Sequence, residues 1–189
     1  MSVIGTSGTS ATFTIVDPRA TTKVSALPAS PPIGDLNGKL IGLRRDEFWQ
    51  SWDWVTDEWA QALEASGAKV LIWRAPVKKG EQAAAGALGF RQFLETIDAG
   101  IFGLCNCGSC TMWAVHDTVH SLNSRMPTLI TATRQFEKLA RALASKSGHT
   151  DLRMVVLPYP LEGLPESEVR DIANQHYAEM LQVFGATTP

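Results

Sequence analysis

The sequence predicts a single doubly wound α/β domain with a mostly parallel five-stranded sheet, preceded by an extended N-terminal arm. Three observations lead to this prediction. The length of 189 residues suits one domain. Five short apolar segments alternate with five segments of helical periodicity, which is typical of a parallel sheet with helices on both faces. A composition of 44% hydrophobic and 19% charged residues excludes collagen-like, coiled-coil and wholly disordered chains.

Residues 1–37 are expected to form the arm, and residues 38–189 the α/β domain that carries the cysteines. The first 37 residues are rich in Ser, Thr, Ala and Pro and show little periodicity. Two alternatives stay open at this point. The arm is disordered, or it lies across the body of the domain or a partner subunit.

The domain is expected to begin with a strand and a long helix. Residues 39–43 form a short apolar run after Gly38, which predicts a buried strand. In residues 46–65, large apolar side chains recur every three or four positions, which predicts a helix that ends at Gly67. These side chains are Phe48, Trp52, Val55, Trp59 and Leu63. Trp49 and Trp54 lie off this stripe and line either a pocket or an oligomer interface.

The remaining strands and helices are expected to alternate. Short apolar runs predict strands at 69–73, 99–104, 128–131 and 152–157. Apolar positions at helical spacing predict helices around 85–97, 109–123, 136–143 and 166–184. His176 lies on the apolar stripe of the last helix and is expected in the core. His149 lies in a Ser-Gly-His-Thr segment and is expected to be a solvated loop residue.

Charge and hydropathy restrict the partners and the location. Seventeen basic and nineteen acidic side chains give a net charge of −2, so no strong field attracts a nucleic acid or an anionic membrane. The apolar stretches are far shorter than the roughly 20 residues that span a bilayer, and the N-terminus lacks the features of a secretory signal. We therefore expect a cytoplasmic homo- or hetero-oligomer that acts on a small-molecule substrate, without nucleic-acid or membrane partners.

All three cysteines, Cys105, Cys107 and Cys110, lie within six residues, between a predicted strand and a predicted helix. A helix N-terminus carries unpaired N–H groups and a partial positive charge, which stabilise a nearby thiolate. In addition, Cys107-Gly-Ser-Cys110 is a C-x-x-C, in which one thiolate can attack and the other can resolve a mixed disulfide. The loop is therefore a candidate catalytic site for redox or covalent thiol chemistry.

Two other interpretations of the cysteines stay open. Three thiolates at C-x-C-x-x-C spacing are typical ligands of zinc, iron or cobalt, and His116, His120 or Asp117 would have to supply the fourth ligand. Alternatively, the three side chains are small buried apolar groups that happen to cluster.

In a doubly wound sheet, ligands bind beyond the carboxyl ends of the strands. This rule and the cysteine loop give the substrate-binding candidates Arg44, Arg45, Arg74, Ser109, Thr111, Thr131, Thr133 and Tyr159. Arg44 and Arg45 either bind a substrate carboxylate bidentately or pair with Asp46, Glu47 or a partner subunit. His116 shares a helix face with Trp113, and it either acts as a general acid or base or packs against a neighbouring element.

The chain also resembles a known family, the UGSC-motif family of selenoprotein-like proteins, in which cysteine often replaces selenocysteine. The resemblance is carried by Asn106-Cys-Gly-Ser-Cys-Thr111, Trp113, His116-Asp117, Pro127-Thr128 and Leu157-Pro-Tyr-Pro-Leu161, and it runs from about residue 17 to the C-terminus. The family is distantly similar to the selenoprotein B component of glycine reductase. The resemblance implies that Cys107 stands at the selenocysteine position and that Cys110 is its partner. Cys105 replaces an expected glycine, and Tyr159 replaces an expected histidine.

Together these observations favour a thiol-dependent enzyme, a reductase or reductive lyase, in which Cys107 attacks an electrophilic small molecule and Cys110 resolves the adduct. Cys105 and His116 complete the expected catalytic set. No cofactor is expected, and an external thiol or electron donor is the expected further partner. One alternative is a metal-dependent hydratase, hydrolase or lyase whose metal is held by the three cysteines. A second alternative is a non-enzymatic partner subunit that senses redox state.

Overall fold

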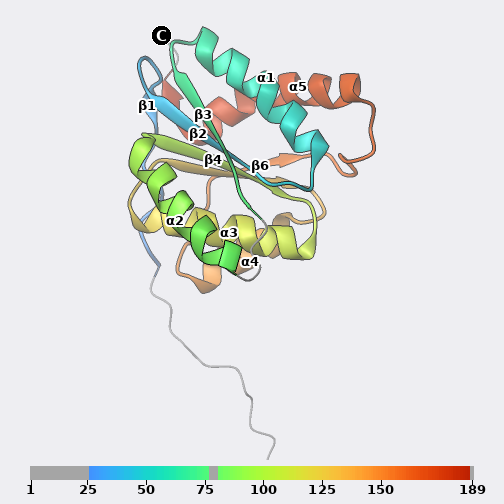
Figure 1. Ribbon diagram of the computed structural model, residues 1–189. Helices are drawn as coiled ribbons and strands as arrows, with labels where there is room; N and C mark the ends of the chain where they lie inside the picture. Colours follow the sequence, from blue (N-terminus) through green and yellow to red (C-terminus); the bar gives the residue numbers. More distant parts are fainter. Residues whose placement is uncertain (1–25, 77–80, 188–189) are drawn as a thin grey trace, which may run out of the picture.

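The computed structural model describes residues 26–76 and 81–187 (Figure 1). The strands in these ranges are β1 (Gly34–Asp35), β2 (Leu40–Arg45), β3 (Lys69–Arg74), β4 (Ala99–Cys105), β5 (Thr128–Thr133), β6 (Met154–Leu157) and β7 (Ala186–Thr187). The helices are α1 (Gln50–Ala65), α2 (Glu81–Thr96), α3 (Gly108–Asn123), α4 (Glu137–Lys146) and α5 (Glu166–Phe184). Within the described ranges, no helix has the length and apolar character needed to cross a membrane.

Five strands form one fully parallel sheet in the order β3-β2-β4-β5-β6. If these five strands are renumbered along the chain, the order is 2-1-3-4-5, which is that of the flavodoxin-like doubly wound fold. The predicted α/β fold with a five-stranded parallel sheet is therefore confirmed. The winding direction reverses between β2 and β4, so the ligand crevice of such a fold is expected beyond the carboxyl ends of these two strands.

Helices cover both faces of the sheet: α1 and α5 lie together on one face, and α2, α3 and α4 lie on the other (Figure 1). Because both faces are covered, every residue of β4 and β5 is buried. Side chains alternate between the faces along β2, where Ile41 and Leu43 belong to the core that also contains α1 and α5. The same alternation directs Arg45 towards α1 and Arg44 towards α3.

Helix α1 begins at Gln50, about four residues later than the periodicity predicts. Phe48 lies before the helix and is 59% exposed, so its predicted place in the buried stripe is wrong. The start of the helix is stabilised by a residue that is far away in the sequence. Glu162 Oε2 accepts hydrogen bonds from Ser51 N at 3.1 Å and from Ser51 Oγ at 2.6 Å. A carboxylate at a helix N-terminus satisfies free N–H groups, and the periodicity of the local sequence cannot reveal it.

The described part of the expected arm, residues 26–37, lies along the domain. Strand β1 pairs in parallel with β7, with Gly34 opposite Ala186, and the two form a second small sheet. Ile33 and Leu36 are buried in the core. This part of the chain therefore belongs to the packing of the domain, whereas residues 1–25 lie outside the described residues.

Candidate functional site

The cysteine loop lies at the carboxyl end of the central strand β4, as the sequence predicts. Cys105 is the last residue of β4, and Cys107 is the N-cap of α3. Strands β2 and β5 flank β4 in the sheet and end with Arg45 and Thr133. The parallel sheet thus brings the cysteines to the same edge as the arginine and threonine candidates.

The Cys107 sulfur occupies the capping position at the start of α3. It accepts a hydrogen bond from Cys110 N at 3.1 Å and lies 3.4 Å from the exposed Ser109 Oγ. The Cys107 carbonyl accepts hydrogen bonds from Thr111 N at 2.9 Å and from Thr111 Oγ1 at 2.6 Å, so the Thr111 hydroxyl holds the loop in place. The helix dipole and the N–H donor favour negative charge on this sulfur once the cysteine is reduced.

Cys107 and Cys110 are joined by a disulfide, with their Cα atoms 5.2 Å apart. The two residues differ in exposure, because Cys107 is half-buried whereas Cys110 is only 8% exposed. In thiol-disulfide exchange the attacking thiol must reach the substrate, while the resolving thiol needs to reach only its neighbour. Of the two cysteines, Cys107 is therefore the more accessible from solution.

Cys105 has a different environment from the disulfide pair. It is a free, fully buried thiol that packs with Ala114 and Ala132 in an apolar cluster. Burial raises the pKa of the Cys105 thiol to about 12, although the charge of Arg44 and a hydrogen bond with Thr111 act in the opposite direction. The sequence leaves open that all three cysteines are small buried apolar groups. In the structure, this description fits Cys105 alone.

We expect Cys105 to resist alkylation in the folded protein. A thiol with a pKa of about 12 is almost entirely protonated at pH 8, and its reactive thiolate forms only at much higher pH. Treatment of the reduced protein with iodoacetamide at pH 8, followed by mass spectrometry, should modify Cys107 and leave Cys105 unmodified until denaturant is added. Alkylation of native Cys105 at the rate of an ordinary exposed cysteine would contradict its placement in the core.

Among residues 26–76 and 81–187, no group of three or more His, Cys, Asp or Glu side chains is placed to hold a metal ion. The sulfurs of Cys107 and Cys110 are bonded to each other, and Cys105 lies in the core. A zinc, iron or cobalt site stays a prediction, which metal analysis of the purified protein tests.

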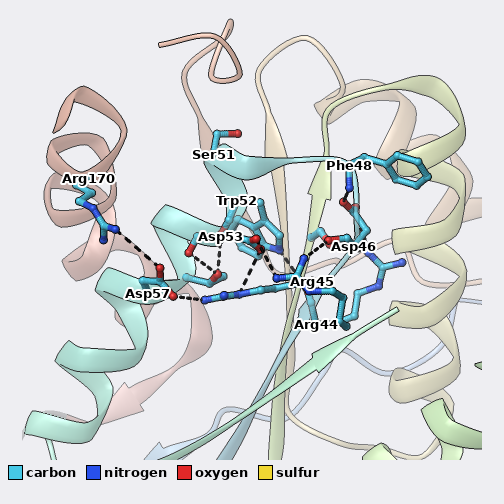
Figure 2. Close-up of polar contacts among 12 residues, drawn as sticks. Arg44, Arg45, Asp46, Phe48, Ser51, Trp52, Asp53, Asp57 and Arg170 are labelled. Carbon is cyan, nitrogen blue, oxygen red and sulfur yellow. Dashed lines mark hydrogen bonds and ion pairs between the residues drawn. The ribbon is translucent and has the colours of Figure 1, made fainter. Parts of the chain in front are cut away.

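Arg44 is buried and is held by groups of this chain, one of which, Asp46, is drawn with it in Figure 2. Its Nε donates a hydrogen bond to Asp117 Oδ2 at 3.1 Å, and its Nη1 donates to Gly103 O at 2.7 Å. Nη1 also lies 3.5 Å from Asp46 Oδ2. Burial raises the pKa of Asp46, although a hydrogen bond from Phe48 N and the charge of Arg44 act in the opposite direction. The sequence leaves two roles open for Arg44, which are binding a substrate carboxylate and forming an ion pair. The structure shows ion pairs with Asp117 and Asp46 of the same chain.

Arg45 points to the opposite face of the sheet, towards carboxylates on α1 (Figure 2). Its Nη2 donates to Asp57 Oδ1 at 2.6 Å, and its Nε lies 3.6 Å from Asp53 Oδ1. Asp53 also pairs with Arg74 at 2.9 Å, and Asp57 lies 3.9 Å from Arg170 of α5. These ion pairs join the ends of β2 and β3 to the two helices on this face. Arg45 and Arg74 thus make ion pairs within the chain.

Asp117 is a residue of the site that the sequence suggests only as a metal ligand. It is 1% exposed and links Arg44 to His116, whose Nδ1 lies 3.4 Å from Asp117 Oδ1. The His116 side chain is 67% exposed and lies six residues beyond Cys110, about 9 Å along the helix. His116 therefore faces solvent beside the loop. The sequence feature that could have identified Asp117 is its position seven residues after Cys110. This spacing places both residues on the buried face of α3.

Family comparison identifies the chain. A sequence model of the UGSC family matches residues 14–186. The chain belongs to the UGSC family. No curated protein matches this UGSC-family sequence at a significant level.

Solved structures with some similarity to this UGSC-family protein include a flavo di-iron protein from Thermotoga maritima. Two mutant forms of it match with TM-scores of 0.46 and 0.44, each at 12% identity over 77% of this chain and 37% of the other. A flavoprotein from the same organism matches with a TM-score of 0.43 at 11% identity, over 77% of this chain and 38% of the other. The UGSC-family chain thus spans less than two fifths of the length of these structures.

Two threonines of β5 in the UGSC-family protein lie close to the loop. Thr133 is buried, and its hydroxyl donates to Asn106 Oδ1 at 2.9 Å and lies 3.3 Å from Cys105 O. Thr133 therefore orients the backbone that leads to Cys107, through Asn106, which the sequence does not single out as a site residue. Thr131 Oγ1 is also buried, and it has no hydrogen-bond partner among the described residues.

Tyr159 is an exposed side chain among the predicted substrate-binding residues that follow the strands. It is 53% exposed, and its ring lies 6.3 Å from that of Phe136 in an edge-on arrangement. Tyr159 follows β6, whereas Phe136 follows β5, so both lie at the carboxyl edge of the sheet. An aromatic surface is thus available to a bound molecule at the edge that carries the disulfide.

Proposed function

We propose that this protein is a thiol-dependent redox enzyme that cleaves an electrophilic small molecule reductively. The observation that carries the proposal is the disulfide between Cys107 and Cys110 at the start of α3, with the more accessible sulfur in the capping position. The UGSC family supports it, because Cys107 stands where the family resemblance puts selenocysteine, and selenium at that position serves nucleophilic or redox chemistry. The family resemblance also implies a distant similarity to the selenoprotein B component of glycine reductase, which is consistent with the same class of reaction.

In the proposed reaction the reduced protein donates two electrons. The Cys107 thiolate attacks the electrophilic atom of the substrate, and the leaving group departs with its bonding electron pair. The Cys110 thiolate then attacks Cys107 Sγ, which forms the disulfide and breaks the bond between sulfur and substrate. The substrate carries that electron pair away and takes up a proton. In balance, one substrate and two thiols give a reduced product, a protonated leaving group and one disulfide.

The surrounding residues have distinct roles in this proposal. Thr111 and Thr133 hold the loop so that the Cys107 sulfur stays at the helix N-terminus. His116, oriented by the buried Asp117, supplies the proton for the leaving group from the solvent side. Tyr159 and Ser109 contact the substrate. An external thiol or electron donor reduces the disulfide, and neither a metal nor an organic cofactor takes part.

The proposal is tested with the reduced protein and a chromogenic aryl disulfide, which serves as a generic electrophile. Wild-type protein should release two aryl thiolates per molecule and return to the Cys107–Cys110 disulfide. The variant Cys110→Ala should release one aryl thiolate and keep the other aryl group on Cys107, because no resolving thiol is present. Mass spectrometry of tryptic peptides locates this adduct.

The matched control for this experiment is Cys105→Ala, which removes the buried thiol and leaves the pair intact. It should release two aryl thiolates, like the wild type. Release of only one thiolate by wild-type protein, or an adduct on Cys105 in the Cys110→Ala variant, would refute the assignment of roles.

A further inference from the structure

A cavity of about 370 Å³ lies at the end of the domain opposite the cysteine loop. It is bounded by residues 27–31, by the end of α3 and by the loop after α4. Helix α3 has 16 residues and begins at the cysteine loop, so about 24 Å of helix separates the loop from this cavity. The cavity is therefore a place distinct from the site proposed above.

The outer wall of the cavity is a strap formed by residues 27–31, which is tied at both ends. Leu27 N donates a hydrogen bond to Gly148 O at 2.9 Å, and Ser30 Oγ accepts one from Thr128 N at 2.8 Å. Pro28 restricts the backbone between these ties and has no N–H group that needs a partner. The strap can therefore span the cavity without collapsing into it, which makes the cavity a preformed space.

His149 lies in the wall of this cavity and is 5% exposed, so its predicted place as a solvated loop residue is wrong. Its Nε2 lies 3.1 Å from Asn123 Oδ1. Burial lowers the pKa of His149, which favours the neutral ring, with Nε2–H donating to the Asn123 oxygen. The sequence could not show this burial, because the strap that covers His149 is more than 100 residues away along the chain.

Arg125 provides the charge in the lining of the cavity. Its guanidinium makes no ion pair or hydrogen bond with another side chain in the described part of the protein. No Asp or Glu is among the residues that line the cavity, and most of the other lining residues are apolar, including Leu122 on α3 and Leu27 of the strap. A preformed apolar space with one cation and no acid complements a small organic anion.

We propose that this cavity binds a small carboxylate with an apolar body. The carboxylate is held by the Arg125 guanidinium, and the apolar body lies between Leu122 and the strap. The volume is near the lower end of the roughly 300–1,000 Å³ that is usual for ligand pockets, so the ligand has the size of a single ring or a short alkyl chain.

The test uses full-length protein titrated with benzoate and, as a neutral isostere, with benzamide, while methyl NMR signals are followed. Benzoate should bind saturably and shift the Leu122 methyl signals, with little change near Cys107, and benzamide should bind at least tenfold more weakly. Arg125→Gln should weaken benzoate binding at least tenfold, because it removes a charge-assisted bidentate contact. Arg91→Gln, an exposed arginine on α2, is the matched control and should leave the affinity unchanged.

Ala29→Phe provides a second variant, because it adds a ring to the strap inside the cavity while Arg125 stays in place. It should abolish the benzoate-dependent shifts of Leu122. The proposal is overturned if benzoate does not bind saturably, if benzamide binds equally well, or if the binding shifts appear at the cysteine loop. Equal affinity in the Arg125→Gln and Arg91→Gln proteins would overturn it as well. None of these outcomes depends on the redox function of the cysteines.

Discussion

Replacing Cys107 with serine is expected to lower the rate at which the reduced protein reacts with a small disulfide by at least about 10³-fold. A serine hydroxyl is not ionised at neutral pH, and the helix N-terminus cannot compensate for the loss of a thiolate. Cys110 remains in this variant, but it is only 8% exposed, so an external disulfide has poor access to it. Stopped-flow absorbance with an aryl disulfide in excess measures the rate.

The comparison variant Cys110→Ser should keep the fast first step, because its attacking thiol is unchanged, and should lose only the second. If Cys107→Ser and Cys110→Ser were slowed equally, the two sulfurs would be equivalent and the difference in their exposure would have no chemical consequence. A fast reaction in Cys107→Ser would assign the attacking role to Cys110.

Replacing Arg44 with methionine is expected to lower the free energy of unfolding by about 3–5 kcal/mol. The guanidinium is buried between the carboxylates of Asp117 and Asp46, at 3.1 and 3.5 Å, and also binds Gly103 O. Without it, the two carboxylates and the carbonyl each lose a charged hydrogen-bond donor in a largely buried place. Urea denaturation of the oxidised protein at neutral pH measures the change.

Arg141→Met is the matched control, since Arg141 pairs with Glu137 at 2.9 Å on the exposed surface of α4. That change should cost less than about 1 kcal/mol. Adding Asp117→Leu to Arg44→Met should recover part of the lost stability, because it removes a buried negative charge that no longer faces the guanidinium. Equal losses for Arg44→Met and Arg141→Met would show that the Arg44 ion pairs contribute no more than surface pairs.

Most of the fold could be predicted because its determinants are local. Apolar runs and helical stripes lie in order along the chain, and a parallel sheet with crossover helices follows from their alternation. The position of the cysteine loop could be predicted for the same reason, since it depends only on the end of one strand and the start of the next helix. Cys107 lies at the start of α3, in the strand-to-helix loop where the sequence places the cysteines.

The features that could not be predicted depend on residues far apart in the sequence. The start of α1 is stabilised by Glu162, more than 100 residues away, so the local pattern wrongly includes Phe48 in a helix that begins after it. The Arg44 ion pair joins β2 to Asp117 on α3, and no local pattern pairs one charge with another on a separate element. The spacing of the cysteines groups Cys105 with its neighbours, because spacing alone does not show that its side chain points into the core.

The pairing of β1 with β7 also determines the order in which the protein can be completed on the ribosome. Gly34 lies opposite Ala186, so one partner is synthesised early and the other about 150 residues later. At a translation rate of about 5–20 residues per second, roughly 8–30 seconds pass before the last neighbours of the apolar side chains Ile33 and Leu36 are synthesised. During that interval the emerging chain exposes them, which is the condition under which chaperones bind nascent proteins.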